Sequence, residues 1–157
     1  MRSLLFVASA SLALSSQTMA QTPGAAGPII ELRVARTSSA PGFTQRGSVA
    51  DTTFFVNDTA LVSDSDIIEA HANRIENLTP MVAIAVTLKP QADDRVATAT
   101  KRHVGDRLAI FLDHEFVGAP PIVSAIGGAG PLHISAGPPA ALDRIVAAVA
   151  ARWPDHH

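Results

Sequence analysis

The most constraining segment of the chain is a run of eight almost entirely apolar residues, Met81–Leu88 (MVAIAVTL). Its length and its β-branched side chains are typical of a strand, and its unbroken hydrophobicity predicts burial on both faces. Pro90 follows directly and fits the first turn of a helix, where its missing N–H costs no hydrogen bond. That helix should stop at Gly105, because glycine readily adopts the left-handed backbone that ends a helix. The chain is therefore expected to mix strands and helices.

Shorter patterns predict the remaining elements. Apolar and charged residues alternate across 29–36, which indicates a half-buried strand. Further strands are expected at 107–113, 116–119, 122–126 and 132–135, and a small hairpin from 51–56 and 60–62. A loop is expected at 37–47 and a hairpin loop at 127–130. A short helix is expected at 66–72, and a final helix carries Leu142, Ile145, Val146, Val149 and Trp153. The predicted fold class is α+β, a small antiparallel or mixed sheet with two or three helices packed on one face.

The first twenty residues have the three parts of a secretory signal peptide. Arg2 supplies the charge, residues 4–14 form an apolar run, and Thr18 and Ala20 place small side chains around a cleavage site. An uncleaved anchor is the alternative, although 4–14 is shorter than the ~20 residues that span a bilayer. We predict a signal peptide at 1–20, a flexible lead-in at 21–28, one domain at 29–153 and a disordered tail at 154–157. No later apolar run reaches about 18 residues, so we expect no transmembrane segment in the mature chain and a periplasmic or secreted location.

Composition and spacing argue against several classes of function. The net charge of −2 and the aromatic content of 4% give little basis for binding nucleic acid. The chain has no cysteine, and therefore no disulfide or thiolate nucleophile. No serine lies in a G-x-S-x-G turn, the 127–130 loop lacks the Lys-Ser/Thr ending of a phosphate loop, and Asp93 and Asp94 suit a helix start better than acid–base catalysis. The internal histidines lack the paired spacing of metal ligands, so we predict no catalytic, metal or cofactor site; they are His71, His103, His114 and His133.

Residues 103–137 carry a pattern that resembles a known family. A helix-ending glycine is followed by a strand reading RLAIFLD, an edge containing Ala-Pro, and a segment reading Ile-Ser. This pattern resembles the head subdomain of the first large periplasmic domain of SecD, a subunit of the SecDF accessory complex of protein translocation. The matching residues are Gly105, Arg107, Leu108, Ala109, Leu112, Asp113, Ala119, Pro120, Ile122, Ile126, Gly128, Ile134 and Gly137. His114 and Pro121 depart from it, since the family usually has a turn glycine and an apolar strand residue there.

The matching residues have structural roles, such as ending a helix or opening a turn. The resemblance therefore implies a SecD head-like fold and an exported, non-enzymatic accessory module that binds polypeptide or envelope protein partners, without proton-driven translocation by itself. Two alternatives stay open, a small exported hydrolase or metal-dependent enzyme and a structural module of an envelope assembly. The edge at 116–126 offers a place for an added peptide strand, but Pro120 and Pro121 are more typical of an edge protected against such pairing.

Overall fold

The computed structural model describes residues 28–75, 80–128, 130–136 and 142–154. Along the chain the elements are β1 (Ile30–Arg36), β2 (Phe43–Val49), β3 (Thr52–Asn57), a 3-10 turn η1 (Asp64–Asp66), β4 (Ile67–Ile75), β5 (Met81–Leu88), α1 (Pro90–Arg102), β6 (Arg107–Leu112), β7 (Glu115–Gly118), β8 (Leu132–Ala136) and α2 (Leu142–Arg152). The predicted signal peptide, nearly all of the lead-in and of the tail, and Gly137 lie outside the described residues.

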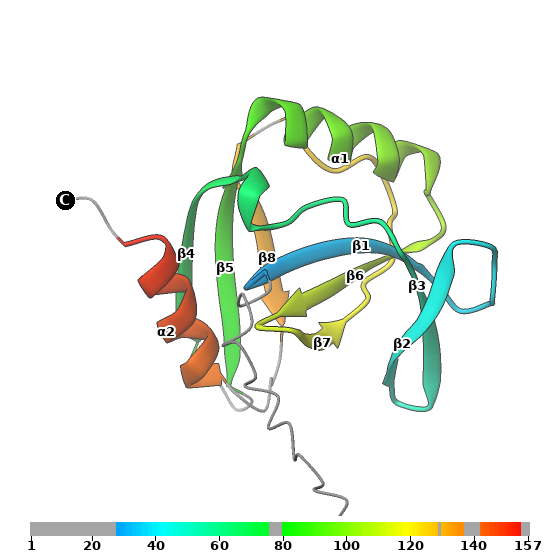
Figure 1. The fold of residues 1–157 in the computed structure, drawn as a ribbon, viewed down its shortest axis with the longest axis horizontal. Coiled ribbons are helices and arrows are strands. Elements are labelled where there is room, and N and C mark those ends of the chain that lie inside the picture. Colours follow the sequence, from blue (N-terminus) through cyan, green and yellow to red (C-terminus); the bar gives the residue numbers. More distant parts are fainter. Residues whose placement is uncertain (1–27, 76–79, 129, 137–141, 155–157) are drawn as a thin grey trace, which may run out of the picture.

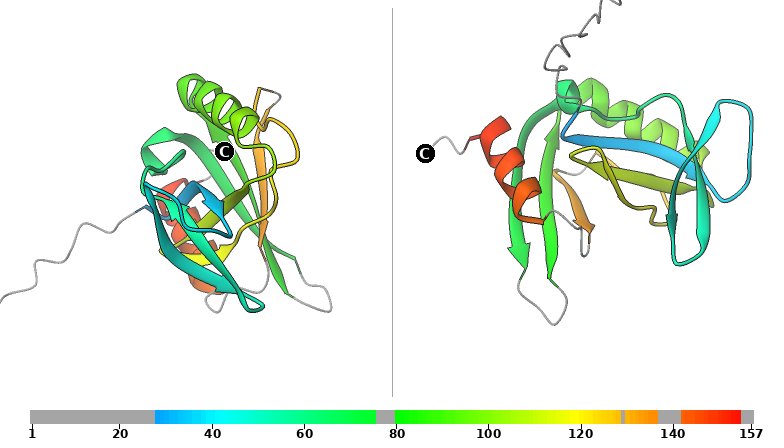
Figure 2. Two further views of the ribbon diagram at one scale, coloured as in Figure 1. Left: turned by 90° about the vertical axis from the view of Figure 1, so that its right-hand side faces the viewer. Right: turned by 60° about the horizontal axis from the view of Figure 1, so that its bottom comes forward.

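Within the described part of the chain, the strands form two antiparallel sheets. The five-stranded sheet has the order β2-β3-β1-β6-β7, and the three-stranded sheet has the order β4-β5-β8. Helix α2 lies beside β4 and the β2–β3 hairpin lies at the opposite end of the molecule (Figure 1, Figure 2). The predicted α+β class is confirmed, with the strands divided between two sheets.

The main hydrophobic core is built from alternate residues of both sheets and from the two helices. Successive strand side chains point to opposite faces, so every second residue of a strand can be buried. From the larger sheet the core takes Ile30, Leu32, Leu108, Ile110 and Leu112, and from β5 it takes Val82, Ile84 and Val86. Helix α2 adds Ile145 and Val149, both fully buried. Strand β4 contributes the small residues Ala70 and Ala72 to this core, which leaves room for the helix packed against it.

The other face of the larger sheet carries a second, aromatic cluster. Phe116 of β7 packs with its ring centroid 5.6 Å from that of Phe54 on β3 and 5.5 Å from that of Phe111 on β6. Strands β2 and β7, at the two edges of the sheet, contact one another. The sheet therefore curls around these rings. Gly47 makes the closure possible, since a Cβ atom there would lie 2.4 Å from the Phe116 ring.

The helix predicted at 66–72 is wrong, because this segment belongs to strand β4. Ser63 and Asp66 form a capping box, but only one 3-10 turn follows, and Ile67 is already extended. From there β4 pairs with β5 as far as Ile75 and Met81. The partner strand overrides the local helix preference, as tertiary context often does.

The predicted loop at 37–47 and the predicted hairpin at 51–62 are also corrected. Strand β2 begins at Phe43 and pairs with β3 through a turn at Ala50 and Asp51, whose φ angles are +45° and +64°. The polar edge strand β2 has no apolar alternation that would distinguish it from a loop. Residues 60–62 pair with β1 instead, where the Leu61 N–H donates to the Leu32 carbonyl at 2.8 Å.

Two further strand predictions need correction. Residues 122–126 form no strand, and β8 pairs with β5 rather than forming a hairpin across 127–130. Strand β5 is fully buried on one face only; Ala83, Ala85 and Thr87 on its other face are half-buried. A continuous apolar run does not distinguish a strand buried on one face from a strand buried on both faces, because alanine and threonine occur in buried and in half-buried positions.

A charged junction joins the end of α1 to β1. Asp106 Oδ2 accepts hydrogen bonds from Arg36 Nε and Nη2 at 3.1 and 3.0 Å, and His103 Nδ1 lies 2.7 Å from the same oxygen. Burial alone would raise the pKa of Asp106, but hydrogen bonds from His103 and Arg36 and the nearby charges lower that pKa below its ordinary value. The ionised carboxylate is therefore the form that stabilises the fold.

Stability should fall in acid in a way that depends on Asp106. Because its pKa is lowered by folding, its contribution is complete above the unfolded pKa of about 3.9 and is lost as the pH falls through the lower folded value. Replacing Asp106 with asparagine should lower the free energy of unfolding by about 1 kcal/mol at pH 6. Urea unfolding at pH 6 and pH 3 measures this difference, which should shrink at pH 3. A difference that does not change with pH would contradict the assignment.

Candidate functional site

The described part of the segment that connects β7 to β8, residues 119–128 and 130–131, runs along α1, and we name it the strap (Figure 1). Two side chains of α1 hold it. The Ile126 N–H donates to Thr100 Oγ1 at 2.8 Å, and the Gly128 N–H donates to Asp93 Oδ2 at 2.7 Å. Thr100 is fully buried and its hydroxyl also donates to the Val96 carbonyl at 2.7 Å. A buried hydroxyl needs such partners, so Thr100 fixes the path of the strap.

Gly127 brings the strap unusually close to α1. Its φ of +116° lies where side chains are strongly disfavoured, and a Cβ atom there would lie 2.7 Å from Asp93 Oδ1 and 3.2 Å from the Asp93 carbonyl oxygen. Only glycine fits both the backbone angle and the approach.

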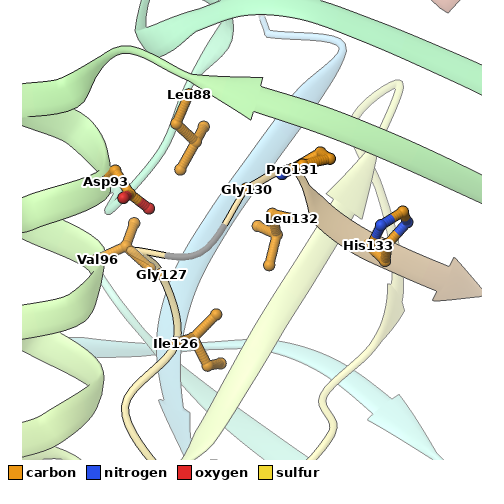
Figure 3. A pocket seen from close by; sticks show the side chains of 9 residues that line it. All are labelled: Leu88, Asp93, Val96, Ile126, Gly127, Gly130, Pro131, Leu132 and His133. Carbon is orange, nitrogen blue, oxygen red and sulfur yellow. The ribbon is translucent and has the colours of Figure 1, made fainter.

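A cavity of about 150 Å³ lies between α1, the strap and the start of β8 (Figure 3). Leu88, Val96, Ile126 and Leu132 surround it with aliphatic side chains, while Asp93 and His133 are its polar lining residues. An apolar cavity of roughly this volume is large enough to hold a benzene molecule. It therefore has room for one branched apolar side chain.

The cavity lies beside an edge strand. Among the described strands, β8 pairs with β5 alone and forms the edge of the three-stranded sheet. An edge strand presents unpaired N–H and C=O groups that an extended peptide can pair with, and alternate side chains of that peptide would share one face. Leu132 and His133, at the first positions of β8, belong to the cavity lining as well. The edge and the cavity thus form one candidate site for an extended apolar segment.

The described lining of the cavity is poor in the side chains that usually act as nucleophiles. The nine lining residues include no serine, threonine, cysteine or lysine. Asp93, their single carboxylate, is hydrogen bonded to the strap. Its position in the first turn of α1 also suits the positive end of the helix dipole. The arrangement can bind and orient a ligand by burial and by backbone pairing.

The four internal histidines lie on separate elements. His71 is on β4, His103 follows α1, His114 lies in the β6–β7 turn, and His133 is on β8. The pairing register places His71 and His133 on either side of Ala85. In the part of the chain that the structure describes, no group of three or more His, Cys, Asp or Glu side chains could hold a metal ion.

The residues of the sequence motif fall in three places. Arg107, Leu108, Ala109 and Leu112 belong to β6, with Gly105 (φ +95°) before it and Asp113 (φ +48°) after it. Ala119, Pro120, Ile122, Ile126 and Gly128 belong to the strap. Ile134 is buried on β8. Ile126 thus lines the cavity. The lining residues Leu88, Asp93 and Val96, and Thr100, which holds the strap, were not predicted, since their role depends on where the strap runs.

Comparison with solved structures shows the same fold. A structure described as "Structure and function of a membrane component SecDF that enhances protein export" shares 19% identity at a TM-score of 0.50, covering 81% of this chain and 63% of that chain. A second, "Crystal structure of SecDF in Super-membrane-facing form", shares 18% identity at a TM-score of 0.52, covering 80% of this chain and 19% of that chain. The chain therefore spans less than two thirds of either structure.

Sequence comparison identifies the family. No curated protein matches the chain. Among the described residues, no helix is long and apolar enough to cross a membrane. The family model for the SecDF P1 head subdomain matches residues 41–139, well over half of the chain. This chain belongs to the family of SecDF P1 head subdomains.

Proposed function

We propose that this chain is a non-catalytic accessory module of protein export that binds extended apolar polypeptide segments along β8. Its place of action is the periplasm, after removal of the signal peptide near Ala20. Family membership supports the link to protein translocation. The role in binding rests on one observation, the apolar cavity that opens beside the free edge of β8.

The binding mode follows from the site. Backbone pairing with β8 gives affinity for any extended segment, and insertion of one apolar side chain into the cavity adds a preference for hydrophobic sequences. Both features belong to unfolded polypeptides, because a folded protein has paired its strands and buried its apolar side chains. The proposed ligand is therefore a segment that has not yet folded.

The test is a fluorescence anisotropy titration with a labelled ten-residue peptide of alternating leucine and serine. The mature chain should bind it with a dissociation constant of roughly 10–100 μM, in the range of weak transient recognition. Leu132→Ser removes an aliphatic wall of the cavity and should weaken binding about tenfold. Val123→Ser is the matched control, because Val123 lies on the strap, is 79% exposed, and does not line the cavity.

A second peptide separates pairing from simple hydrophobic contact. N-methylation of alternate residues removes the N–H donors needed on one side of a strand and should abolish binding. Circular dichroism confirms that each variant is folded. No saturable binding up to high micromolar concentration, or equal binding of both peptides, would reject the proposal.

A further inference from the structure

A second hollow of about 310 Å³ lies at the carboxy-terminal end of β1. It is lined by Arg36, Thr37, Ser38, Gly105, Asp106 and Arg107. It shares no residue with the cavity beside β8. Its lining is polar and includes two arginines and two hydroxyl-bearing residues. Groups of this kind are hydrogen-bond donors, and the guanidinium fork matches the geometry of carboxylate and phosphate oxygens.

Both arginines are held in place by aromatic rings of the β2–β3 hairpin. The guanidinium carbon of Arg36 lies 5.0 Å from the centre of the Phe43 ring, and that of Arg107 lies 5.6 Å from the centre of the Phe54 ring. A second contact orients each group, since Arg36 donates to Asp106 and Arg107 Nη1 donates to the Ala119 carbonyl at 2.9 Å. Side chains that are already ordered lose little entropy when they bind a ligand.

The charges in this hollow do not cancel. Asp106 is its single carboxylate, and Arg36 and His103 both contact the Oδ2 atom of that residue. Among the described residues, Arg107 has no carboxylate partner. Its Nε and Nη2 groups make no hydrogen bond within the described part of the chain. The hollow therefore keeps one net positive charge and unused donors next to the hydroxyl groups of Thr37 and Ser38.

We propose that this hollow is a binding site for a compact oxyanion, a phosphate or carboxylate group. Arg107 supplies the main bidentate contact, and Arg36, Ser38 and Thr37 complete the set of donors. The site gives Arg107 a role that its position in a strand does not require. The proposal is independent of peptide binding along β8.

The experiment titrates the folded mature chain with inorganic phosphate, and separately with acetate, at constant ionic strength. Amide chemical shifts of Ser38 and Gly105 are followed by NMR. At least one of the two anions should produce saturable shifts with a dissociation constant of about 1 mM or tighter. The anion that binds more tightly identifies the preferred group.

Matched variants distinguish a specific anion site at Arg107 from general attraction of anions to a positively charged surface. Arg107→Gln should weaken binding about tenfold, and Arg107→Lys should weaken it less, because lysine keeps the charge but loses the fork. Arg46→Gln is the control, because it removes the same charge. Arg46 is exposed on β2 and lies outside the hollow. If Arg107→Gln fails to fold, the Arg107→Lys titration decides: weaker anion binding than by the unchanged chain supports the site, and equal binding contradicts it. No saturation up to about 50 mM, or equal weakening by the Arg46 and Arg107 variants, would overturn the proposal.

Discussion

Replacing Gly47 with alanine should lower the free energy of unfolding by roughly 2–3 kcal/mol, because the added Cβ atom would overlap an aromatic ring. The added Cβ would lie 2.4–2.7 Å from three carbon atoms of the Phe116 ring. That ring has little room to move, because it packs against Phe54 and Phe111. Urea unfolding followed by circular dichroism measures the loss.

The double variant Gly47→Ala with Phe116→Ala provides the control. Phe116→Ala alone leaves a cavity and should also destabilise the fold. In the double variant the alanine no longer meets the ring, so its cost should largely disappear and the two losses should not add. Simple additivity, or an unchanged midpoint for Gly47→Ala alone, would show that β2 does not close against β7.

Replacing Gly127 with alanine should be comparably damaging, by about 2–3 kcal/mol, for a different reason. At φ +116° a side chain strains the backbone, and the added Cβ would also press on the Asp93 carboxylate and carbonyl. The strap should then detach from α1. Hydrogen exchange of the Ile126 amide, which is bonded to Thr100, should become much faster.

Gly128→Ala is the matched comparison. Gly128 also has a positive φ, +84°, but a Cβ atom there would meet nothing within 4 Å. It should cost only the backbone strain, about 1 kcal/mol. A larger loss for Gly127→Ala therefore reflects the close approach of the strap to α1 together with the extra strain at φ +116°. Equal losses would show that no such approach exists.

The elements that could be predicted from the sequence are those whose apolar pattern has one explanation. Strands β5 and β6 and helix α2 have strong patterns, and α1 has Pro90 at its start and basic residues Lys101 and Arg102 in its last turn. Strands β2 and β4 were not predicted because their side chains are largely polar or small. Their conformation depends on β3 and β5, the strands that pair with them.

The candidate site was less accessible to sequence reasoning than the fold. Ile126 and Gly128 were recognised as part of a family pattern, yet without a function. Asp93 was interpreted as a residue that favours a helix start, which is true, but its bond to Gly128 spans two distant segments. Such contacts follow from the path of an irregular segment, and no local pattern encodes that path.

The pairing of β1 has a consequence for how the molecule acquires its structure. Ile30 pairs with Leu112 and Ala35 with Arg107. Strand β1 can therefore pair with β6 only after most of the described chain is available. Contacts between residues so distant in sequence slow folding, because a large loop must close before they form. Strand β1 therefore lacks this partner until β6 is available. The β1–β6 pair should thus form late in folding.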